Sequence, residues 1–271
     1  MRGRVIPILA AIACLAGPVS AAPLTLISKA PAPQMATDEL LLHSGSLGRD
    51  FLIQVTHPFA EKPGKSYPAI YALDGGYSIA GPMAWVMGGG GAMARAFVVS
   101  VGYRPDAYAM RDRDLLFQPV DHDGRTIGGG GADFERFLVD ELMPFIAARY
   151  AVEPANSVLF GHSEGGLFAA HVMLDRPAAF SSYIICSPAL WMEPDLIDRL
   201  PQARPSAGAP RVFVGVGGKE DARMTEAARI VAAALSANYS VRSETFAGAA
   251  HLAYYPMAVA TAFPYVLPPE R

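Results

Sequence analysis

The sequence predicts an α/β fold in a single domain, with a mostly parallel, twisted sheet covered by helices on both faces. Two observations carry this prediction. In the second half of the chain, continuous apolar runs typical of buried strands alternate with segments of helical periodicity. The composition does not shift along the chain and no internal repeat occurs, so the roughly 250 residues after the leader are expected to share one core.

The first 21 residues are predicted to be a secretory signal peptide and not part of the fold. Arg2 and Arg4 give a positive start, an apolar run covers residues 5–15, and small residues at 19–21 provide a cleavage site. The apolar run is shorter than the roughly 20 residues that a membrane anchor needs. We therefore expect residues 22–271 to be exported to the periplasm or secreted.

Charge, hydropathy and cysteine content exclude several classes of function. Without the leader the chain has 20 basic and 25 acidic residues, a net charge of −5, and no basic stripe suited to nucleic acid or an anionic membrane. The apolar stretch 83–102 contains Arg95 and four consecutive glycines at 88–91, so we expect a helix end, a loop and a buried strand instead of a membrane span. Cys14 leaves with the leader, a lipid anchor on it being the alternative, and Cys186 remains as a lone buried thiol.

The N-terminal half is predicted to contain four strands and then a long irregular segment. The strands are expected at residues 39–43, 51–56, 67–73 and 96–101, with a hairpin link over 44–50. Residues 103–131 are polar and end in four consecutive glycines. A loop of this length is uncommon in a compact domain and is typical of a functional or mobile segment.

Strand and helix signals alternate through the C-terminal half. Strands are expected at residues 157–160, 183–186, 211–216 and 241–246, and helices at 133–150, 167–174, 224–235 and 253–266. This order gives parallel strands joined by helical crossovers.

A G-x-S-x-G pattern stands between a predicted strand and a predicted helix. Gly161, Ser163 and Gly165 fit a nucleophile elbow, in which a sharp turn holds the serine in a strained, exposed position. A Cβ at either glycine is expected to collide with the neighbouring strand or helix. Strand alternation is expected to point the intervening His162 away from the serine. An incidental serine in a glycine-rich turn is the alternative interpretation.

The chain also supplies an acid and a base for an activated serine, in the order serine, acid, histidine. His251 follows the last predicted strand, where the ligands of such a sheet bind. Glu220 and Asp221 follow the preceding strand, and either carboxylate is a candidate for orienting the histidine.

Two backbone N–H groups are expected to hold the oxyanion, each contributing about 2.7–4 kcal/mol. One belongs to Glu164, directly after the serine. The other is assigned to Gly76, in the Asp74-Gly75-Gly76 turn after an early strand, and a plain tight turn is the alternative. This chemistry requires no metal and no cofactor, and none is expected.

Short motifs spread over nearly all of residues 22–271 match one family. They are Tyr71-Ala72-Leu73-Asp74-Gly75, Val101-Gly102-Tyr103, Arg111-Asp112-Arg113-Asp114-Leu115, Leu159-Phe160-Gly161-His162-Ser163, Ser187-Pro188-Ala189-Leu190-Trp191 and Phe246-Ala247-Gly248 with His251. On these motifs the chain resembles the putative-esterase branch of the α/β hydrolases. That branch includes enterochelin esterases, the trilactone esterase of the salmochelin system and, more distantly, esterase D and the antigen 85 acyltransferases.

The resemblance implies an α/β-hydrolase fold with Ser163 as nucleophile and His251 as base. The G-E-x-E pattern common before the acid in this family aligns with residues 217–220, which favours Glu220 over Asp221. Gly218 stands where the first glutamate of that pattern belongs, a departure from the family. Some siderophore esterases work with a weak or absent acid, so a Ser–His dyad is the alternative.

Two further residues are assigned to substrate binding by the resemblance. Arg111 lies in a motif that approaches the active-site mouth, where a guanidinium is expected to bind an anionic or catecholate substrate. The alternative is a structural ion pair with Asp114. Trp191 is expected to form an apolar wall of the pocket, and an ordinary core tryptophan is the alternative.

Together these features predict an exported serine carboxylic-ester hydrolase that works through an acyl-enzyme. The resemblance points to siderophore trilactones such as enterobactin or salmochelin as substrates, and small acyl or sugar esters are the second choice. The partner is thus a small-molecule ester, and the sequence makes no prediction of oligomeric state. A non-catalytic binding protein on the same scaffold and an acyltransferase are the alternatives from other classes.

Overall fold

The computed structural model describes residues 36–74, 79–104, 107–206 and 210–269. The predicted signal peptide (1–21) and the predicted oxyanion donor Gly76 lie outside the described residues. All the described residues fall within one compact unit.

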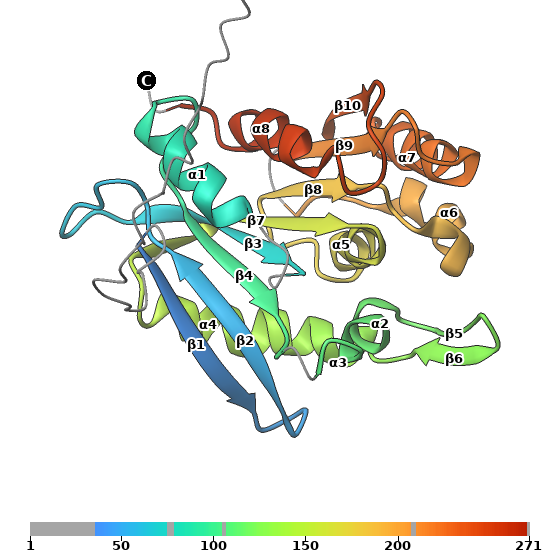
Figure 1. Ribbon diagram of the computed structural model, residues 1–271, viewed down its shortest axis with the longest axis horizontal. Helices are drawn as coiled ribbons and strands as arrows, with labels where there is room; N and C mark the ends of the chain where they lie inside the picture. Colours follow the sequence, from blue (N-terminus) through green and yellow to red (C-terminus); the bar gives the residue numbers. More distant parts are fainter. Residues whose placement is uncertain (1–35, 75–78, 105–106, 207–209, 270–271) are drawn as a thin grey trace, which may run out of the picture. The chain divides into compact units, whose positions relative to one another are not determined.

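The described chain is built around an eight-stranded sheet with the order β1-β2-β4-β3-β7-β8-β9-β10. β1 and β2 pair antiparallel, as do β2 and β4, and every other neighbouring pair is parallel (Figure 1). The strands are β1 (Thr37–Ser44), β2 (Arg49–Thr56), β3 (Tyr67–Leu73), β4 (Phe97–Gly102), β7 (Val152–His162), β8 (Ser182–Cys186), β9 (Arg211–Gly217) and β10 (Ser240–Phe246). The predicted mostly parallel α/β sheet is confirmed.

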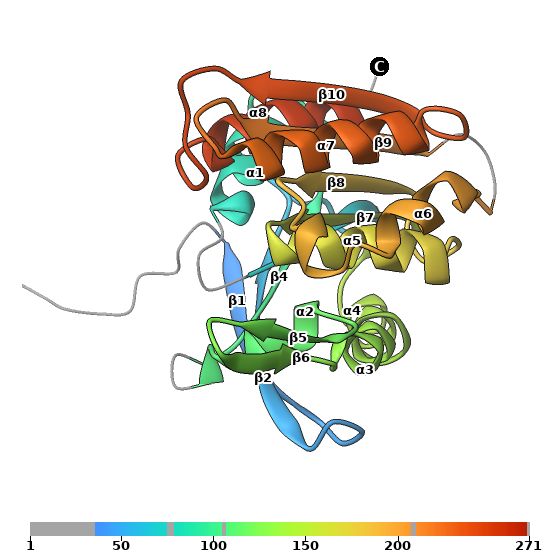
Figure 2. The same ribbon diagram turned by 90° about the vertical axis from the view of Figure 1, so that its right-hand side faces the viewer.

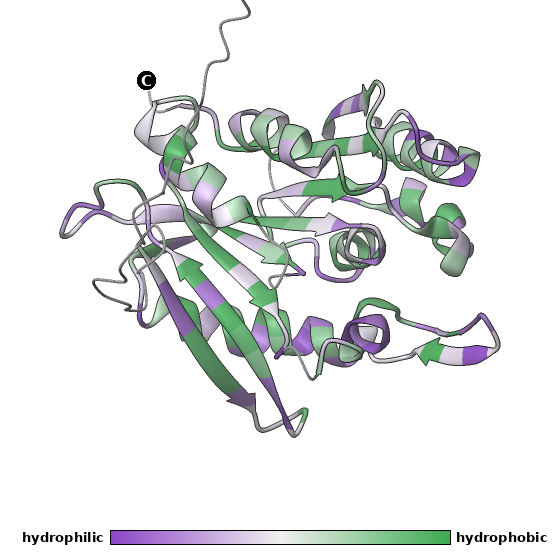
Figure 3. Ribbon diagram, viewed as in Figure 1, coloured by the Kyte–Doolittle hydropathy of each residue, from purple (hydrophilic) through white to green (hydrophobic). Residues whose placement is uncertain are grey.

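Helices pack on both faces of this sheet because its central strands are apolar on both sides. In β3, Tyr71 belongs to one core cluster, while its neighbours Ile70 and Ala72 belong to the other. The first cluster includes residues of α5 (Glu164–Asp175) and α7 (Ala222–Leu235), and the second includes residues of α1 (Ala80–Gly89) and α8 (Tyr255–Val266). Figure 2 shows the helices on either side of the strands, and Figure 3 shows the hydrophobic colouring of the central strands.

The remaining helices are short or composite. They are α2 (Met110–Leu115), α3 (Gly131–Arg136), η3 (Phe137–Leu142), α4 (Met143–Ala147), η4 (Leu190–Met192), α6 (Leu196–Arg199) and η5 (Leu200–Gln202). The helix predicted over 133–150 is therefore α3, η3 and α4 in succession, with one π-helical stretch in its middle. In the part of the chain that the structure describes, no helix is long and apolar enough to span a membrane.

Residues 103–131 are not the irregular loop that the sequence predicted. They contain α2 and a separate hairpin of β5 (Pro119–His122) and β6 (Arg125–Gly128). The base of the hairpin is closed by the Leu116 carbonyl, which accepts hydrogen bonds from the N–H groups of Gly129 and Gly131. Gly128 has φ of +88°, and a Cβ there would lie 2.3 Å from the Gln118 carbonyl oxygen. The glycine tract thus permits a close backbone approach that ends the hairpin.

Candidate active site

Ser163 occupies a strained turn between the end of β7 and the start of α5. Its φ is +61° and its ψ is −119°, a conformation that non-glycine residues rarely adopt. The elbow geometry predicted from the sequence is present, and it turns the chain from the carboxyl end of a central strand directly into a helix.

The glycines around the serine agree with the sequence-based expectation at one position and differ from it at another. A Cβ on Gly161 would lie 1.9 Å from the Gly165 carbonyl oxygen, which confirms the predicted clash at this position. A Cβ on Gly165 would find its nearest neighbour at 3.4 Å, so the clash predicted there is wrong. The close approach is at Gly166, where a Cβ would lie 2.7 Å from the carbonyl oxygen of Cys186 in β8.

A glutamate and a histidine meet at the carboxyl ends of β9 and β10. His251 Nδ1 lies 2.6 Å from Glu220 Oε2. The other carboxylate oxygen, Oε1, accepts hydrogen bonds of 2.7 Å from the Ser187 hydroxyl and from the Gly217 N–H. Burial alone would raise the pKa of Glu220, but the hydrogen bonds from His251, Ser187 and Gly217 hold it below its usual value. The carboxylate is therefore ionised and fixed, and it orients the imidazole.

The adjacent carboxylate, Asp221, faces a different part of the molecule. It caps α7, accepting hydrogen bonds from the backbone N–H groups of Arg223 at 2.9 Å and Met224 at 3.1 Å. Its side chain is half exposed and also pairs with the Arg223 guanidinium. Of the two acids that the sequence left open, Glu220 contacts His251 and Asp221 does not.

Ser163 and His251 line one cavity of about 640 Å³. Among the described residues no direct hydrogen bond joins their side chains, a common situation in sites without substrate. Its lining in the described ranges also includes Asp74, Ile79, Tyr108, Arg111, His162, Leu252, Tyr255 and Pro256. The serine, the histidine and the histidine's glutamate are thus grouped where ligands of a parallel sheet bind.

His162 lies at this cavity, contrary to the prediction that it points away. Its Nε2 is 3.0 Å from the His251 carbonyl oxygen, and the two ring centroids are 4.3 Å apart. Burial lowers the pKa of His162 to about 4, so the ring is neutral near pH 7 and its Nε2–H donates to the carbonyl. His162 follows strand alternation, since it lies on the same face as Phe160, where both rings contact Tyr255. The loop carrying His251 folds over this face at the end of β7 and brings His162 to the cavity.

Ser187 and Tyr254 also belong to the site and were not singled out by sequence. Ser187 follows β8 with a φ of +42° and is fully buried. Its hydroxyl bonds to Glu220 and lies 2.5 Å from the Tyr254 hydroxyl. A serine directly after a buried strand, at the edge of the sheet where Ser163 also lies, was the signal available in the sequence.

Arg111 reaches the cavity but is held by carboxylates. Its Nε lies 2.5 Å and its Nη2 3.2 Å from the oxygens of Asp74, and its Nη1 lies 2.8 Å from Glu164 Oε2. Burial alone would lower the pKa of Arg111, but the two carboxylates raise it, so the guanidinium is charged. The alternative partner predicted from sequence, Asp114, pairs instead with Arg49.

Trp191 and Cys186 lie away from the cavity. Trp191 is in η4, packs against the main core, and has the Arg223 guanidinium 5.2 Å from its ring centroid. The described residues lining the cavity do not include it, and apolar contact there comes from residues such as Ile79 and Leu252.

Cys186 is fully buried, as predicted, and burial raises the pKa of its thiol to about 12. In the described ranges, no cluster of His, Cys, Asp or Glu has the arrangement of a metal site.

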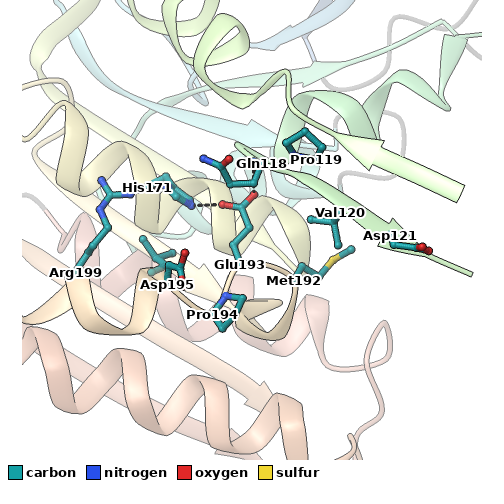
Figure 4. Close-up of a pocket in the computed structure, with 11 residues that line it drawn as sticks. Gln118, Pro119, Val120, Asp121, His171, Met192, Glu193, Pro194, Asp195 and Arg199 are labelled. Carbon is teal, nitrogen blue, oxygen red and sulfur yellow. Dashed lines mark hydrogen bonds and ion pairs between the residues drawn. The ribbon is translucent and has the colours of Figure 1, made fainter. Parts of the chain in front are cut away.

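A second cavity of about 530 Å³ lies between the hairpin and α6 (Figure 4). In it, His171 of α5 reaches the Glu193 carboxylate, with Nε2 and Oε2 2.6 Å apart. Glu193 also accepts hydrogen bonds from the N–H groups of Phe117 at 2.6 Å and Gln118 at 3.0 Å. The Phe117 ring stacks on His171 with centroids 4.1 Å apart. These contacts fasten the base of the β5–β6 hairpin to the core.

Comparison with known proteins places the chain in a family. Residues 44–259 match the profile of the family described as "Putative esterase". Ferri-bacillibactin esterase BesA of Bacillus subtilis is 29% identical over 263 residues, which cover 86% of this chain and 90% of that protein. The siderophore triacetylfusarinine C esterase of Aspergillus fumigatus is 32% identical over 172 residues, 59% of this chain and 58% of that protein.

The fold is shared with solved structures at low sequence identity. The structure of BES protein from Bacillus cereus superposes with a TM-score of 0.76 at 24% identity, covering 90% of this chain and 99% of that one. The family match spans most of the chain and includes the strands that carry the serine, the glutamate and the contacts of the histidine. The chain therefore belongs to the "Putative esterase" family, has the α/β-hydrolase fold and is a carboxylic ester hydrolase.

Proposed function

We propose that the protein is an exported serine esterase that hydrolyses siderophore esters through an acyl-enzyme on Ser163. The observation that carries the proposal is the 2.6 Å hydrogen bond between His251 Nδ1 and Glu220, beside the cavity that Ser163 also lines. A strained serine with an oriented histidine next to it is the arrangement required for nucleophilic catalysis.

In this mechanism Glu220 holds the Nδ1–H tautomer of His251, which leaves Nε2 to accept the hydroxyl proton of Ser163. The Ser163 oxygen attacks the ester carbonyl, and the bond to the alcohol breaks as His251 returns the proton to the departing oxygen. Water then repeats the sequence on the acyl-enzyme, with His251 again taking and returning one proton. The acid product leaves and Ser163 is restored.

The oxyanion of each tetrahedral intermediate is assigned to two backbone N–H groups, those of Glu164 and Gly76. Glu164 is the first residue of α5, so its N–H points from a helix N-terminus, where the helix dipole favours negative charge. Gly76 is assigned from its sequence position after β3. Each donor is expected to contribute about 2.7–4 kcal/mol to the transition state.

The substrate class is proposed from the relatives. Both curated relatives described above are named as esterases of siderophores, and one of them covers most of this chain. Small acyl or sugar esters are the alternative substrates for the same site. Incubation with ferric and iron-free siderophore lactones, beside a panel of acetylated sugars, separates the two by which hydrolysis products form.

Substitution of Ser163 tests the chemistry. Ser163→Ala is expected to lower kcat on p-nitrophenyl butyrate by about 10⁴-fold or more and to abolish labelling by a fluorophosphonate probe. Ser46→Ala, on the exposed β1–β2 turn, is a matched control that should leave both unchanged. Turnover or labelling that survives in Ser163→Ala contradicts the assignment, and a wild-type protein that neither labels nor turns over ester supports a non-catalytic binding protein.

Export is proposed from residues 1–21. Expression of the full chain in a Gram-negative host should give a periplasmic or secreted protein whose mass corresponds to a start at Ala22. Retention of the uncut chain in the cytoplasm would contradict this part of the proposal and leave the esterase assignment intact.

A further inference from the structure

Large apolar side chains are exposed around the mouth of the catalytic cavity. Leu252, directly after His251, is 75% exposed. Ile79, which directly precedes α1, is also exposed. Both line the cavity, together with Tyr255 and Pro256. Exposed apolar side chains that gather at one concave site indicate a surface that is covered by an apolar ligand.

The cation at this cavity is already neutralised. Among the described lining residues Arg111 carries the permanent positive charge, and its guanidinium donates three hydrogen bonds to the carboxylates of Asp74 and Glu164. Burial raises the pKa of Glu164, while the Arg111 guanidinium opposes this shift. A third carboxyl group, that of Asp112, lies 3.7 Å from Arg111 Nη1, so three carboxyl groups are arranged around one guanidinium. Arg111 is buried for most of its surface, as are its two partners.

Arg111 cannot be recruited by an anionic substrate without loss elsewhere. Turning the guanidinium toward a substrate carboxylate or catecholate would leave Asp74 and Glu164 as largely buried, unpaired charges, which is strongly unfavourable. Asp74 also has a φ of +61°, so its position is constrained by the backbone. An incoming anion would thus meet a guanidinium that is already paired, with more carboxyl groups than cations around it.

We infer that the catalytic cavity selects esters that are apolar and uncharged near the scissile bond and discriminates against anionic ones. The inference rests on the proposed function at Ser163 and reverses the role that the sequence suggested for Arg111, which here organises the cavity wall and is not an anion receptor.

A pair of esters that differ in one terminal group measures the selection. The neutral ester is p-nitrophenyl hexanoate, and the anionic ester is the mono-p-nitrophenyl ester of adipic acid, with the same leaving group. At low ionic strength, kcat/KM for the neutral ester should exceed that for the anionic ester by about tenfold or more. The ratio should shrink as salt screens the carboxylates.

The outcomes separate this inference from the proposed function. Equal kcat/KM values, or a preference for the anionic ester, would overturn the selection while leaving the esterase assignment standing. Turnover of neither ester by the wild-type protein would overturn the esterase assignment itself.

A charge placed at the mouth provides a second measurement. Leu252→Lys should lower the ratio of kcat/KM for the neutral ester to kcat/KM for the anionic ester by about fivefold, because the added cation attracts the adipate carboxylate. The matched control is Leu41→Lys, since Leu41 is 54% exposed on β1, at the opposite edge of the sheet from β10. The control should leave the ratio at its wild-type value. Equal effects of the two lysines on the ratio would overturn the inference.

Discussion

Within the described residues, two buried glutamates each contact a histidine at the same nitrogen–oxygen distance, and the two pairs differ in how accessible the histidine is. His251 and Glu220 are 2.6 Å apart at the catalytic cavity, and His171 and Glu193 are 2.6 Å apart at the second cavity. In both pairs burial would raise the pKa of the glutamate and hydrogen-bond donors lower it below its usual value. The histidines differ, because the side chain of His251 is 35% exposed and that of His171 is 4% exposed.

The surroundings of each imidazole explain this difference. His171 has Glu193 at Nε2, the Arg199 guanidinium 3.4 Å from Nδ1, and Phe117 stacked on its face. His251 has Glu220 at Nδ1, packs against the His162 ring and lines the catalytic cavity. A short glutamate–histidine contact is therefore not sufficient to identify a catalytic base. The His171–Glu193 pair is enclosed by other side chains and has a structural role, and we call it the closed pair. The His251–Glu220 pair is accessible to a ligand, and we call it the open pair.

The largest expected effect is on activity, and it tests whether only the open pair serves catalysis. Glu220→Gln should lower kcat on p-nitrophenyl butyrate by about 10²–10⁴-fold with little change in KM, because the imidazole loses its orienting carboxylate. Glu193→Gln, the same change in the closed pair, should stay within about threefold of wild type. Similar losses of kcat in both variants would contradict the claim that only the open pair serves catalysis. A loss of kcat below about tenfold in Glu220→Gln would favour a Ser–His dyad.

An intermediate effect is expected on stability in acid, and it comes from His162, which is buried like His171. The pKa of His162 falls from 6.5 to about 4 on folding, so the unfolded chain binds a proton between these values and the folded chain does not. Stability should therefore decrease as the pH falls from about 6.5 to about 4, by up to about 3 kcal/mol from this group. Denaturant titrations at pH 7, 5.5 and 4.5 measure the decrease.

The substitution His162→Gln separates this titration from the contact with the His251 carbonyl. Glutamine keeps a donor and does not titrate, so the pH dependence of stability in this range should flatten while kcat remains within about tenfold of wild type. His162→Leu removes the donor as well, and should lower kcat further. An unchanged pH dependence in His162→Gln would contradict the assignment of a buried, neutral ring.

The smallest expected effect sharpens the choice between the adjacent acids. Asp221→Ala removes the N-cap of α7 and should lower the free energy of unfolding by about 1 kcal/mol, with kcat unchanged. Thermal denaturation and steady-state kinetics on the same sample measure both quantities. A large loss of kcat in this variant would transfer the role of Glu220 to Asp221.

Most of the fold was predictable because the strand signals are strong and regular. The apolar runs around Val98, Ile184 and Val214 gave the central strands, and the residues just beyond the strands gave the serine, the acids and the histidine. Parallel strands bring their carboxyl ends to one edge, so chain order alone predicted which side chains meet.

The remaining features depend on contacts between segments far apart in the sequence. Arg111 could not be matched to Asp74 and Glu164, because the partners come from three different elements. His162 follows strand alternation along β7, but the loop from another strand closes over it. The β5–β6 hairpin was missed because its short, polar strands lack the apolar alternation that predicts a strand.

The burial of Cys186 has a practical consequence for experiments on this enzyme. In a chain that begins after residue 21 it is the sole cysteine, it has no exposed surface, and its thiol is protonated at neutral pH. A cysteine introduced at the cavity mouth, for example at Leu252, would be the one thiol that a maleimide dye or spin label can reach. Fluorescence or electron paramagnetic resonance could then report substrate binding without any change to the native thiol.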